Sequence, residues 1–481
     1  MLFNSYAFIL IFLPATFAVF HLLRRAGLER GAFAALAAAS LIFYGWWSLE
    51  GLALLAALIL VNFVLARWMI RLGARRDRRS RLALALAIAF NLGVLGYFKY
   101  FNFFIATADQ VAGLRWTFAQ VVLPLGISFF TFQKIALLVD CHAGKVKSLD
   151  FLDYVLFVVF FPQLIAGPIV HHSEVMPQFR ARAPVTAQVL AQALAIFTLG
   201  LAKKVLLADT LARYAGPVFD AAGRGEAVGL VDGWIGALAY TLQLYFDFCG
   251  YSEMAIGAAL LFGVRLPLNF ASPYKAASII EFWRRWHMTL SRFLRDYLYI
   301  PLGGNRHGQP RRYLNLFVTM LLGGLWHGAG WTFVIWGCLH GGCLVANHLW
   351  RGWRREPLPG ERAVGAALTF TAVVLGWVLF RARDLDAAGR VLAGMAGRSG
   401  LQAQPTDLTA AALIAILLAV VWLAPNTQEL TGYRPEGAFE EPAASAHAGS
   451  WATAKALALG CAFAGAFLSL SKVSEFLYFQ F

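Results

Sequence analysis

Long apolar runs alternate with short polar loops along the whole chain. A helix needs roughly 20 mostly apolar residues to cross about 30 Å of hydrocarbon, so each run predicts a membrane-spanning helix. The predicted spans are residues 3–23, 32–48, 52–67, 82–105, 117–139, 151–170, 188–208, 230–248, 251–264, 313–325, 331–350, 363–380, 408–424 and 451–470. The pattern therefore predicts an all-α polytopic membrane protein, with some segments short enough to be re-entrant.

Composition supports a membrane protein and explains the positive charge. The chain is 59% hydrophobic and 14% charged, with a formal net charge of +15. The basic residues lie in short loops between apolar runs, which indicates membrane orientation rather than nucleic-acid binding. Seven arginines between residues 67 and 81 face a single Asp77, so this loop is predicted to be cytoplasmic. The first apolar run has no basic n-region and no small-residue cleavage site before Arg24, so we expect it to be retained. Two spans separate the loop at Arg24 from the cytoplasmic loop, so the N-terminus is predicted to lie outside.

Interruptions within one apolar run predict an internal cavity. Pro162 and Gly167-Pro168 break the run at 151–170, and irregular backbone at membrane depth is tolerated only where protein or a water-filled cavity surrounds it. Residues 1–481 are expected to form a single membrane domain. A repeat is not visible in the sequence, which gives an inverted-repeat transporter no support.

Residues 271–312 are predicted to form an amphipathic region at the cytoplasmic face, because eight basic residues there face two acidic ones. At about 100° per residue, one side of a helix would carry the apolar positions Trp283, Trp286, His287, Leu290 and Leu294. The other side would carry Arg284, Arg285, Arg292 and Arg295. His287 therefore points into protein or a cavity, either as a functional imidazole or as a hydrogen-bonded core histidine.

The central candidate is His327 in the motif at 323–330, where glycines and the indoles of Trp326 and Trp331 surround one imidazole. Ionisable residues within membrane segments are rare and are functional candidates by default. A neutral imidazole with apolar walls could accept a proton from an attacking hydroxyl. The alternative is a structural histidine in a tight helix crossing.

No metal site is predicted. His327 and His340 lie thirteen residues apart, and the pair at His171-His172 has no carboxylate at local ligand spacing. The five cysteines are scattered through apolar sequence and show no paired spacing. Neither a nucleotide-binding glycine loop nor a serine-nucleophile elbow occurs.

Several motifs resemble the membrane-bound O-acyltransferase family, in its alginate O-acetyltransferase I branch. They are residues 278–291 (SIIEFWRRWHMTLS), 294–306 (LRDYLYIPLGGNR) and 323–328 (GGLWHG), with further matches at 95–100, 123–129, 164–168 and 243–248. The chain departs from the family pattern at His171, Cys249 and Glu253, which bears on substrate preference.

The resemblance implies a ring of about 11 transmembrane helices, with re-entrant and amphipathic helices, around a central tunnel that leads from the cytoplasm to a buried histidine. It assigns the catalytic histidines to His327 and His287. Substrate contacts are expected from Trp283, Trp286, Arg284, Arg285, Trp326, Asp247 and Asn305. It implies no tightly bound cofactor, and an acyl thioester donor such as acetyl-CoA or an acyl carrier protein on the cytoplasmic side. The setting would be the bacterial inner membrane, with lipid around the chain and no nucleic acid.

The C-terminal segment at 476–481 (FLYFQF) resembles tails in related acyl-transfer systems whose tyrosine carries the acyl group. Tyr478 is therefore either an acyl relay to a periplasmic SGNH-type acetyltransferase partner or an aromatic anchor at the membrane interface. The favoured acceptor is alginate. Cellulose, peptidoglycan and teichoic acid remain open, as do a transporter and a structural subunit of a polysaccharide export complex.

Overall fold

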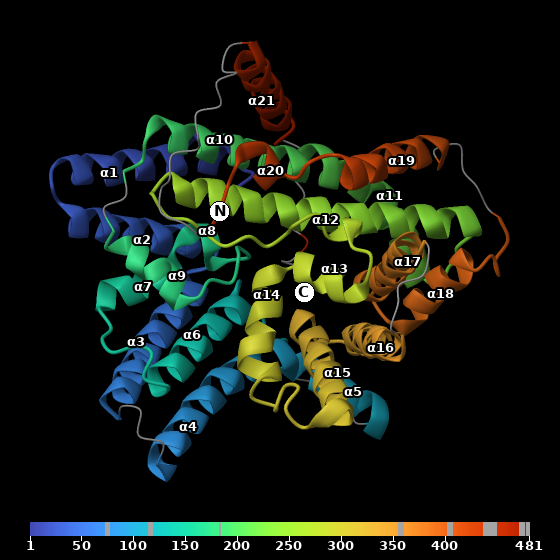
Figure 1. The fold of residues 1–481 in the computed structure, drawn as a ribbon, viewed down its shortest axis with the longest axis horizontal. Coiled ribbons are helices and arrows are strands. Elements are labelled where there is room, and N and C mark those ends of the chain that lie inside the picture. Colours follow the sequence, from blue (N-terminus) through green and yellow to red (C-terminus); the bar gives the residue numbers. More distant parts are fainter. Residues whose placement is uncertain are drawn as a thin grey trace. The chain divides into compact units, whose positions relative to one another are not determined.

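The computed structural model is helical and describes residues 1–72, 77–113, 119–181, 184–354, 360–401, 407–435, 450–470 and Leu477 (Figure 1). No strand occurs among these residues, so the all-α prediction is confirmed for them. Five helical segments of this part of the chain are long and apolar enough to cross a membrane: Ala7–Arg25, Leu49–Leu72, Arg78–Ala112, Ala187–Gly223 and Glu361–Arg381. The figure of about 11 crossings stays a prediction.

The chain folds into two compact units that interleave in sequence. Unit 1 comprises Met1–Leu199, Tyr251–Pro267 and Tyr433–Ala462, and unit 2 comprises Gly200–Gly250, Leu268–Gly432 and Phe463–Phe481. The single domain and the ring around a tunnel stay predictions.

Unit 1 holds α1 (Leu13–Arg25), α2 (Glu29–Gly45), α3 (Leu49–Leu72), α4 (Arg78–Leu95), α5 (Phe101–Ala112), α6 (Ile127–His142), α7 (Phe151–Val159), α8 (Phe161–Leu164) and α9 (His172–Val175). Unit 2 holds α11 (Asp209–Gly223), α13 (Ile279–Arg285), α14 (Met288–Leu294), α15 (Gly308–His327), α16 (Trp331–Trp353), α17 (Glu361–Arg381), α18 (Leu385–Met395), α19 (Asp407–Leu423) and α20 (Thr427–Thr431). Residues of both units occur in α10 (Ala187–Ala202), α12 (Leu230–Leu260) and α21 (Ser450–Leu468).

The segment 151–170 is a hairpin, so its prediction as a span is wrong. Its two helices, α7 and α8, are 9 and 4 residues long, too short to cross a membrane. Asp150 at its start pairs with Arg30 in the first turn of α2 at 2.9 Å, and His171 just after its end pairs with Asp140 at the end of α6 at 2.7 Å. Entry and exit are therefore both tied to loop ends of neighbouring helices in unit 1, as a re-entrant segment requires.

The predicted spans 230–248 and 251–264 are one helix through residue 260, α12, with 31 residues. Gly250, which separates the two apolar runs, allows close packing instead of a turn, since a Cβ there would lie 2.6 Å from the carbonyl oxygen of Gly200. The number of crossings stays a prediction.

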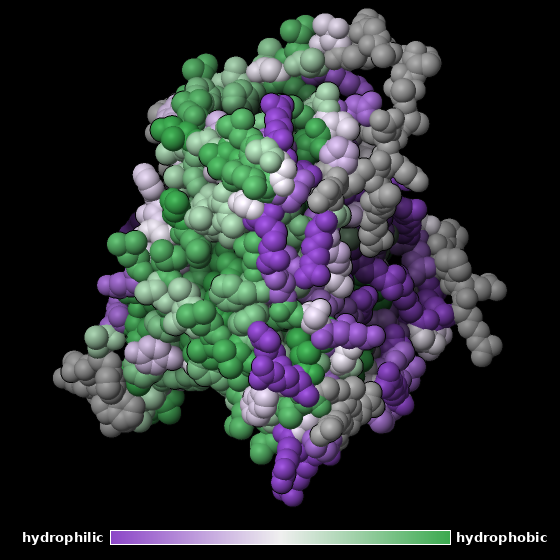
Figure 2. Space-filling model, turned by 90° about the vertical axis from the view of Figure 1, so that its left-hand side faces the viewer, coloured by the Kyte–Doolittle hydropathy of each residue, from purple (hydrophilic) through white to green (hydrophobic). Residues whose placement is uncertain are grey.

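The helices of unit 1 expose large apolar side chains, among them Leu10, Ile11, Leu60, Val64 and Leu86. Figure 2 shows one face of the molecule with a broad apolar area and hydrophilic residues gathered beside it. Soluble proteins rarely expose apolar areas of this kind, whereas helices in contact with lipid must do so.

Candidate active site

His327 ends α15, and its position depends on a tight helix pair. Gly328 leaves the helix with extended backbone, and α16 starts at Trp331 and runs back alongside α15. Gly337 of α16 makes this approach possible, because a Cβ there would lie 2.7 Å from the carbonyl oxygen of Met320 on α15. The glycine-rich motif thus serves helix packing, as the sequence analysis allowed, and it also fixes where the imidazole lies.

Aromatic rings surround the His327 imidazole. Its centroid lies 5.0 Å from the ring of Trp326, 5.1 Å from that of Trp336 and 5.2 Å from that of Phe380. Only 5% of the residue is exposed. An imidazole in such surroundings has little water to compete for its proton, which suits acid–base chemistry.

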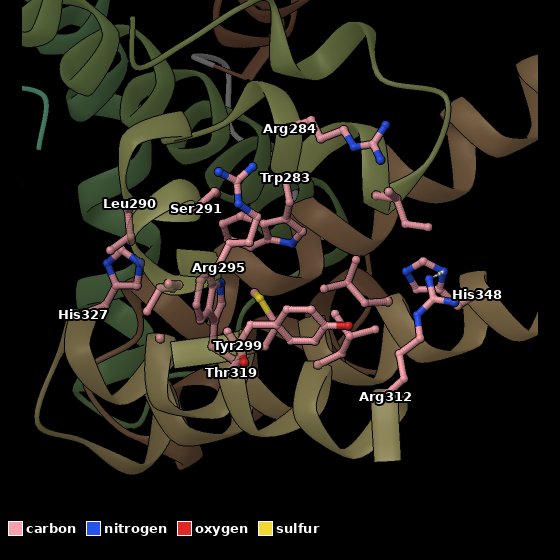
Figure 3. Close-up of a pocket in the computed structure, with 17 residues that line it drawn as sticks. Trp283, Arg284, Leu290, Ser291, Arg295, Tyr299, Arg312, Thr319, His327 and His348 are labelled. Carbon is pink, nitrogen blue, oxygen red and sulfur yellow. Dashed lines mark hydrogen bonds between the residues drawn. The ribbon is translucent and has the colours of Figure 1, made fainter. Parts of the chain in front are cut away.

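A cavity of about 310 Å³ leads to His327 within unit 2. Figure 3 shows His327 at one end and Arg284, Arg312 and His348 toward the other. Arg312 donates from Nη2 to Nδ1 of His348 at 3.0 Å. Between the two ends the walls are mostly apolar, and the lining includes Ile280, Leu290, Leu294, Leu316, Met320 and Leu344. The cavity can therefore hold an elongated ligand with an anionic end and an apolar stem.

His287 interrupts the predicted amphipathic helix, so the prediction of one continuous helix is wrong. The helix α13 ends before Trp286, and His287 adopts φ 42° and ψ 53° directly before α14. The left-handed region costs a non-glycine residue roughly 1–2 kcal/mol. Strain of this size persists where the surroundings determine the conformation, and it is frequent at functional sites.

The side chain of His287 is fully buried and held by Asn269. Its Nδ1 lies 3.1 Å from Oδ1 of Asn269, which also accepts from the Thr289 hydroxyl at 2.8 Å. Because an amide oxygen only accepts, Nδ1 carries the proton and the lone pair belongs to Nε2. Burial lowers the pKa of His287 to about 3, so the imidazole is neutral near neutral pH.

His287 lies close to His327 but is not part of the cavity wall. The two ring centroids are 6.3 Å apart, and the Trp326 ring lies 6.2 Å from that of His287. Trp326 is 5% exposed and also stays outside the cavity lining. Asn305, another predicted substrate contact, is exposed and lies outside this cavity.

The four predicted contacts at residues 283–286 divide into two sets. Trp283 and Arg284 line the cavity. Trp286 is buried in an aromatic core, and Arg285 pairs with Glu281 at 2.7 Å, so neither reaches it. Two of these four residues, Trp283 and Arg284, therefore lie where they would contact a substrate bound in the cavity.

Asp247 has a different environment from the one predicted. Its Oδ1 pairs with the buried ammonium of Lys204 at 2.7 Å, and Lys204 also pairs with Asp209 at 2.8 Å. Oδ2 of Asp247 accepts from the backbone N–H of Leu477 at 3.1 Å. Asp247 therefore anchors the C-terminal tail of unit 2. Tyr478 itself lies outside the described residues.

Sequence reasoning missed Arg312, His348 and Tyr299, which line the cavity. Arg312 and His348 are 36 residues apart, beyond any local motif. Their proximity could have been inferred from the short loop between α15 and α16. Two helices joined by a short loop run antiparallel, which places Arg312 near the start of α15 beside His348 near the end of α16.

Comparison with known proteins assigns the family. The family model described as membrane-bound O-acyltransferase matches residues 82–382. The peptidoglycan O-acetyltransferase of Helicobacter pylori is 42% identical over 83% of this chain and 81% of that protein. A protein of Azotobacter vinelandii named probable alginate O-acetylase AlgI is 39% identical over the whole of both chains. The teichoic acid D-alanyltransferase of Streptococcus thermophilus is 28% identical over 53% of this chain and 68% of that protein.

The chain belongs to the membrane-bound O-acyltransferase family. It is an acyltransferase and a multi-pass membrane protein, so the predictions of enzyme class and of membrane embedding are confirmed.

Proposed function

We propose that this protein moves an acetyl group from a cytoplasmic thioester donor across the bacterial inner membrane for O-acetylation of an exopolysaccharide, with alginate as the polymer. The observation that carries the proposal is the cavity that joins the basic residues Arg284 and Arg312 to His327. A thioester of coenzyme A or of an acyl carrier protein has an anionic phosphate, a narrow flexible arm and a terminal acyl group. The phosphate matches the basic end of the cavity, the arm matches its apolar walls, and the acyl group matches the end at His327.

In the proposed reaction, a hydroxyl oxygen attacks the thioester carbonyl beside His327. The new C–O bond forms and the C–S bond breaks. The imidazole takes the hydroxyl proton and passes it to the leaving thiolate, so it returns to its neutral form. General-base catalysis of this kind contributes about 10²- to 10⁴-fold in rate. His287 is held by Asn269 and lies against Trp326 and His327 at the end of α15. Because His287 does not line the cavity, we assign it the role of positioning the His327 imidazole.

Tyr478 is the proposed first acceptor, and a periplasmic SGNH-type acetyltransferase is the proposed recipient of its acetyl group. A phenol ordinarily has a pKa near 10 and needs a base to attack a thioester, which the imidazole supplies. The buried anchor between Asp247 and the backbone of Leu477 supports this role, because it holds the residue next to Tyr478 in the interior of unit 2.

Full-length protein in detergent, incubated with acetyl-CoA or acetylated carrier protein, tests the relay directly. Mass spectrometry of the C-terminal peptide should find one acetyl group on Tyr478, absent from Tyr478→Phe. A peptide that stays unmodified while the donor is consumed would contradict the relay.

Peptidoglycan is the second candidate polymer, because a relative named for it is 42% identical over most of this chain. Deleting the gene in its host and measuring ester-linked acetate on alginate and on peptidoglycan separates the two. Acetate lost from alginate alone supports the proposal, and acetate lost from peptidoglycan alone supports the alternative.

A further inference from the structure

Three side chains of unit 1 that the acyltransferase account leaves unused converge at the end of α6. Nε2 of His171 lies 2.7 Å, and Nε2 of His172 3.1 Å, from Oδ2 of Asp140. Asp140 is fully buried. The two histidines have no carboxylate at ligand spacing in the sequence, but Asp140 lies beside both of them in the fold. Asp140 precedes His171 by 31 residues and is brought to it by the re-entrant hairpin.

We propose that Asp140, His171 and His172 bind a divalent transition cation of the zinc type. Each residue offers one ligand atom, and these atoms all lie within 4.8 Å of one another. Two imidazole nitrogens and one carboxylate oxygen, with a water in the fourth position, form an established ligand set for Zn²⁺. The hard, all-oxygen sets preferred by Mg²⁺ and Ca²⁺ differ from this one.

Ser173 lies beside the other ring nitrogen of His171. Nδ1 accepts from the backbone N–H of Ser173 at 3.3 Å, so in this structure Nε2 carries the ring proton and donates it to Oδ2 of Asp140. A metal bound at Nε2 would replace this proton, and Nδ1 would then carry the proton of the neutral ring. Oγ of Ser173, 2.6 Å from Nδ1, is placed to accept it.

Lys145 places a positive charge beside the proposed site and would weaken cation binding by repulsion. Its ammonium pairs with Oδ1 of Asp140 at 2.7 Å, on the other carboxylate oxygen from the imidazoles, and 64% of its side chain is exposed. The cation and Lys145 can therefore occupy Asp140 together, but their like charges repel each other. Removing the ammonium should tighten metal binding by about threefold to tenfold.

The cation would cross-link two segments of unit 1 and so stabilise the fold. It would join the end of α6 to the exit of the hairpin and so close a long loop, which stabilises the native state over the unfolded chain. The inference does not depend on the proposed acetyl transfer, since none of its residues lines the cavity at His327.

The test uses full-length protein in detergent, with any affinity tag removed, dialysed against Zn²⁺ and then against metal-free buffer. Elemental analysis should find about one zinc per chain in the wild type and in His142→Ala, a control that removes an imidazole of α6 outside the cluster. Asp140→Asn and the His171→Ala/His172→Ala double variant should lose it. Co²⁺ in place of Zn²⁺ should give the visible absorption of a four-coordinate site.

Lys145→Ala keeps the proposal testable if the other variants fold poorly. This variant retains all three ligands, and titration with Zn²⁺ should show tighter binding than the wild type. If neither the wild type nor Lys145→Ala retains zinc, or if His142→Ala loses as much zinc as the double variant, the cluster is an ion-pair network and the proposal is wrong.

Discussion

Replacing Arg284 and Arg295 with Gln should weaken donor binding while leaving the chemical step intact. Both arginines line the cavity and are exposed, and Arg284 lies toward the end away from His327 (Figure 3), so we expect them to attract the anionic part of the donor. Arg285→Gln is the matched control. It removes an arginine from the same helix as Arg284, but one that pairs with Glu281 and does not line the cavity.

Exposure sets the magnitude of the effect. An exposed ion pair contributes about 0.2–1 kcal/mol, so losing two of them costs roughly 0.4–2 kcal/mol. At 0.59 kcal/mol for RT, this range corresponds to an increase in KM of about 2- to 30-fold. The wild-type KM should also rise with added salt, since charges more than about 10 Å apart are screened at 0.1 M ionic strength. The double variant should respond less to salt.

The assay is release of free thiol from acetyl-CoA across a range of donor concentrations, by purified protein supplied with the periplasmic acetyltransferase and polysaccharide that receive the acetyl group. The reasoning is refuted if kcat falls while KM stays constant, because the arginines would then act on the transition state. It is equally refuted if Arg285→Gln raises KM as much as the double variant does.

Three further outcomes are expected. His287→Gly and His287→Ala should lose activity alike, but the glycine variant should be more stable by roughly 1 kcal/mol, because only alanine is strained at φ 42°; equal melting temperatures would contradict this. Gly337→Ala should lower the free energy of unfolding by about 1–3 kcal/mol through overpacking against Met320, whereas Gly342→Ala, with nothing within 4 Å of its added Cβ, should not; chemical denaturation of both variants measures it. Tyr478→Phe should abolish polysaccharide acetylation while leaving protein levels unchanged, and normal ester-linked acetate would make the tail an anchor only.

The helical class and the buried position of His327 beside a cavity could be predicted from the sequence because they depend on local signals. Apolar runs report a span directly, and one imidazole among glycines and indoles stands out in such a run. The break at His287 could not be predicted, because helical periodicity stays the same when a single residue takes a left-handed conformation. Its cause is tertiary, since Asn269 holds the ring from 18 residues away.

The same limit applies to the charged residues. Asp247 was predicted to contact substrate because of its motif, but its partners, Lys204 and Leu477, come from distant parts of the chain. The hairpin at 151–170 was partly visible, because Pro162 and Gly167 mark its bends. Gly167 in particular cannot carry a Cβ without meeting the backbone of Gln163.

The most direct test of the central claim is acetyl-donor turnover by purified His327→Ala protein beside the wild type. The His327 imidazole is assigned to proton transfer, so turnover should fall by about 10²- to 10⁴-fold. Donor binding and the amount of protein in the membrane should stay unchanged, and His142→Ala should retain full activity. Turnover at the wild-type rate in His327→Ala would show that the imidazole serves helix packing alone and would contradict the mechanism.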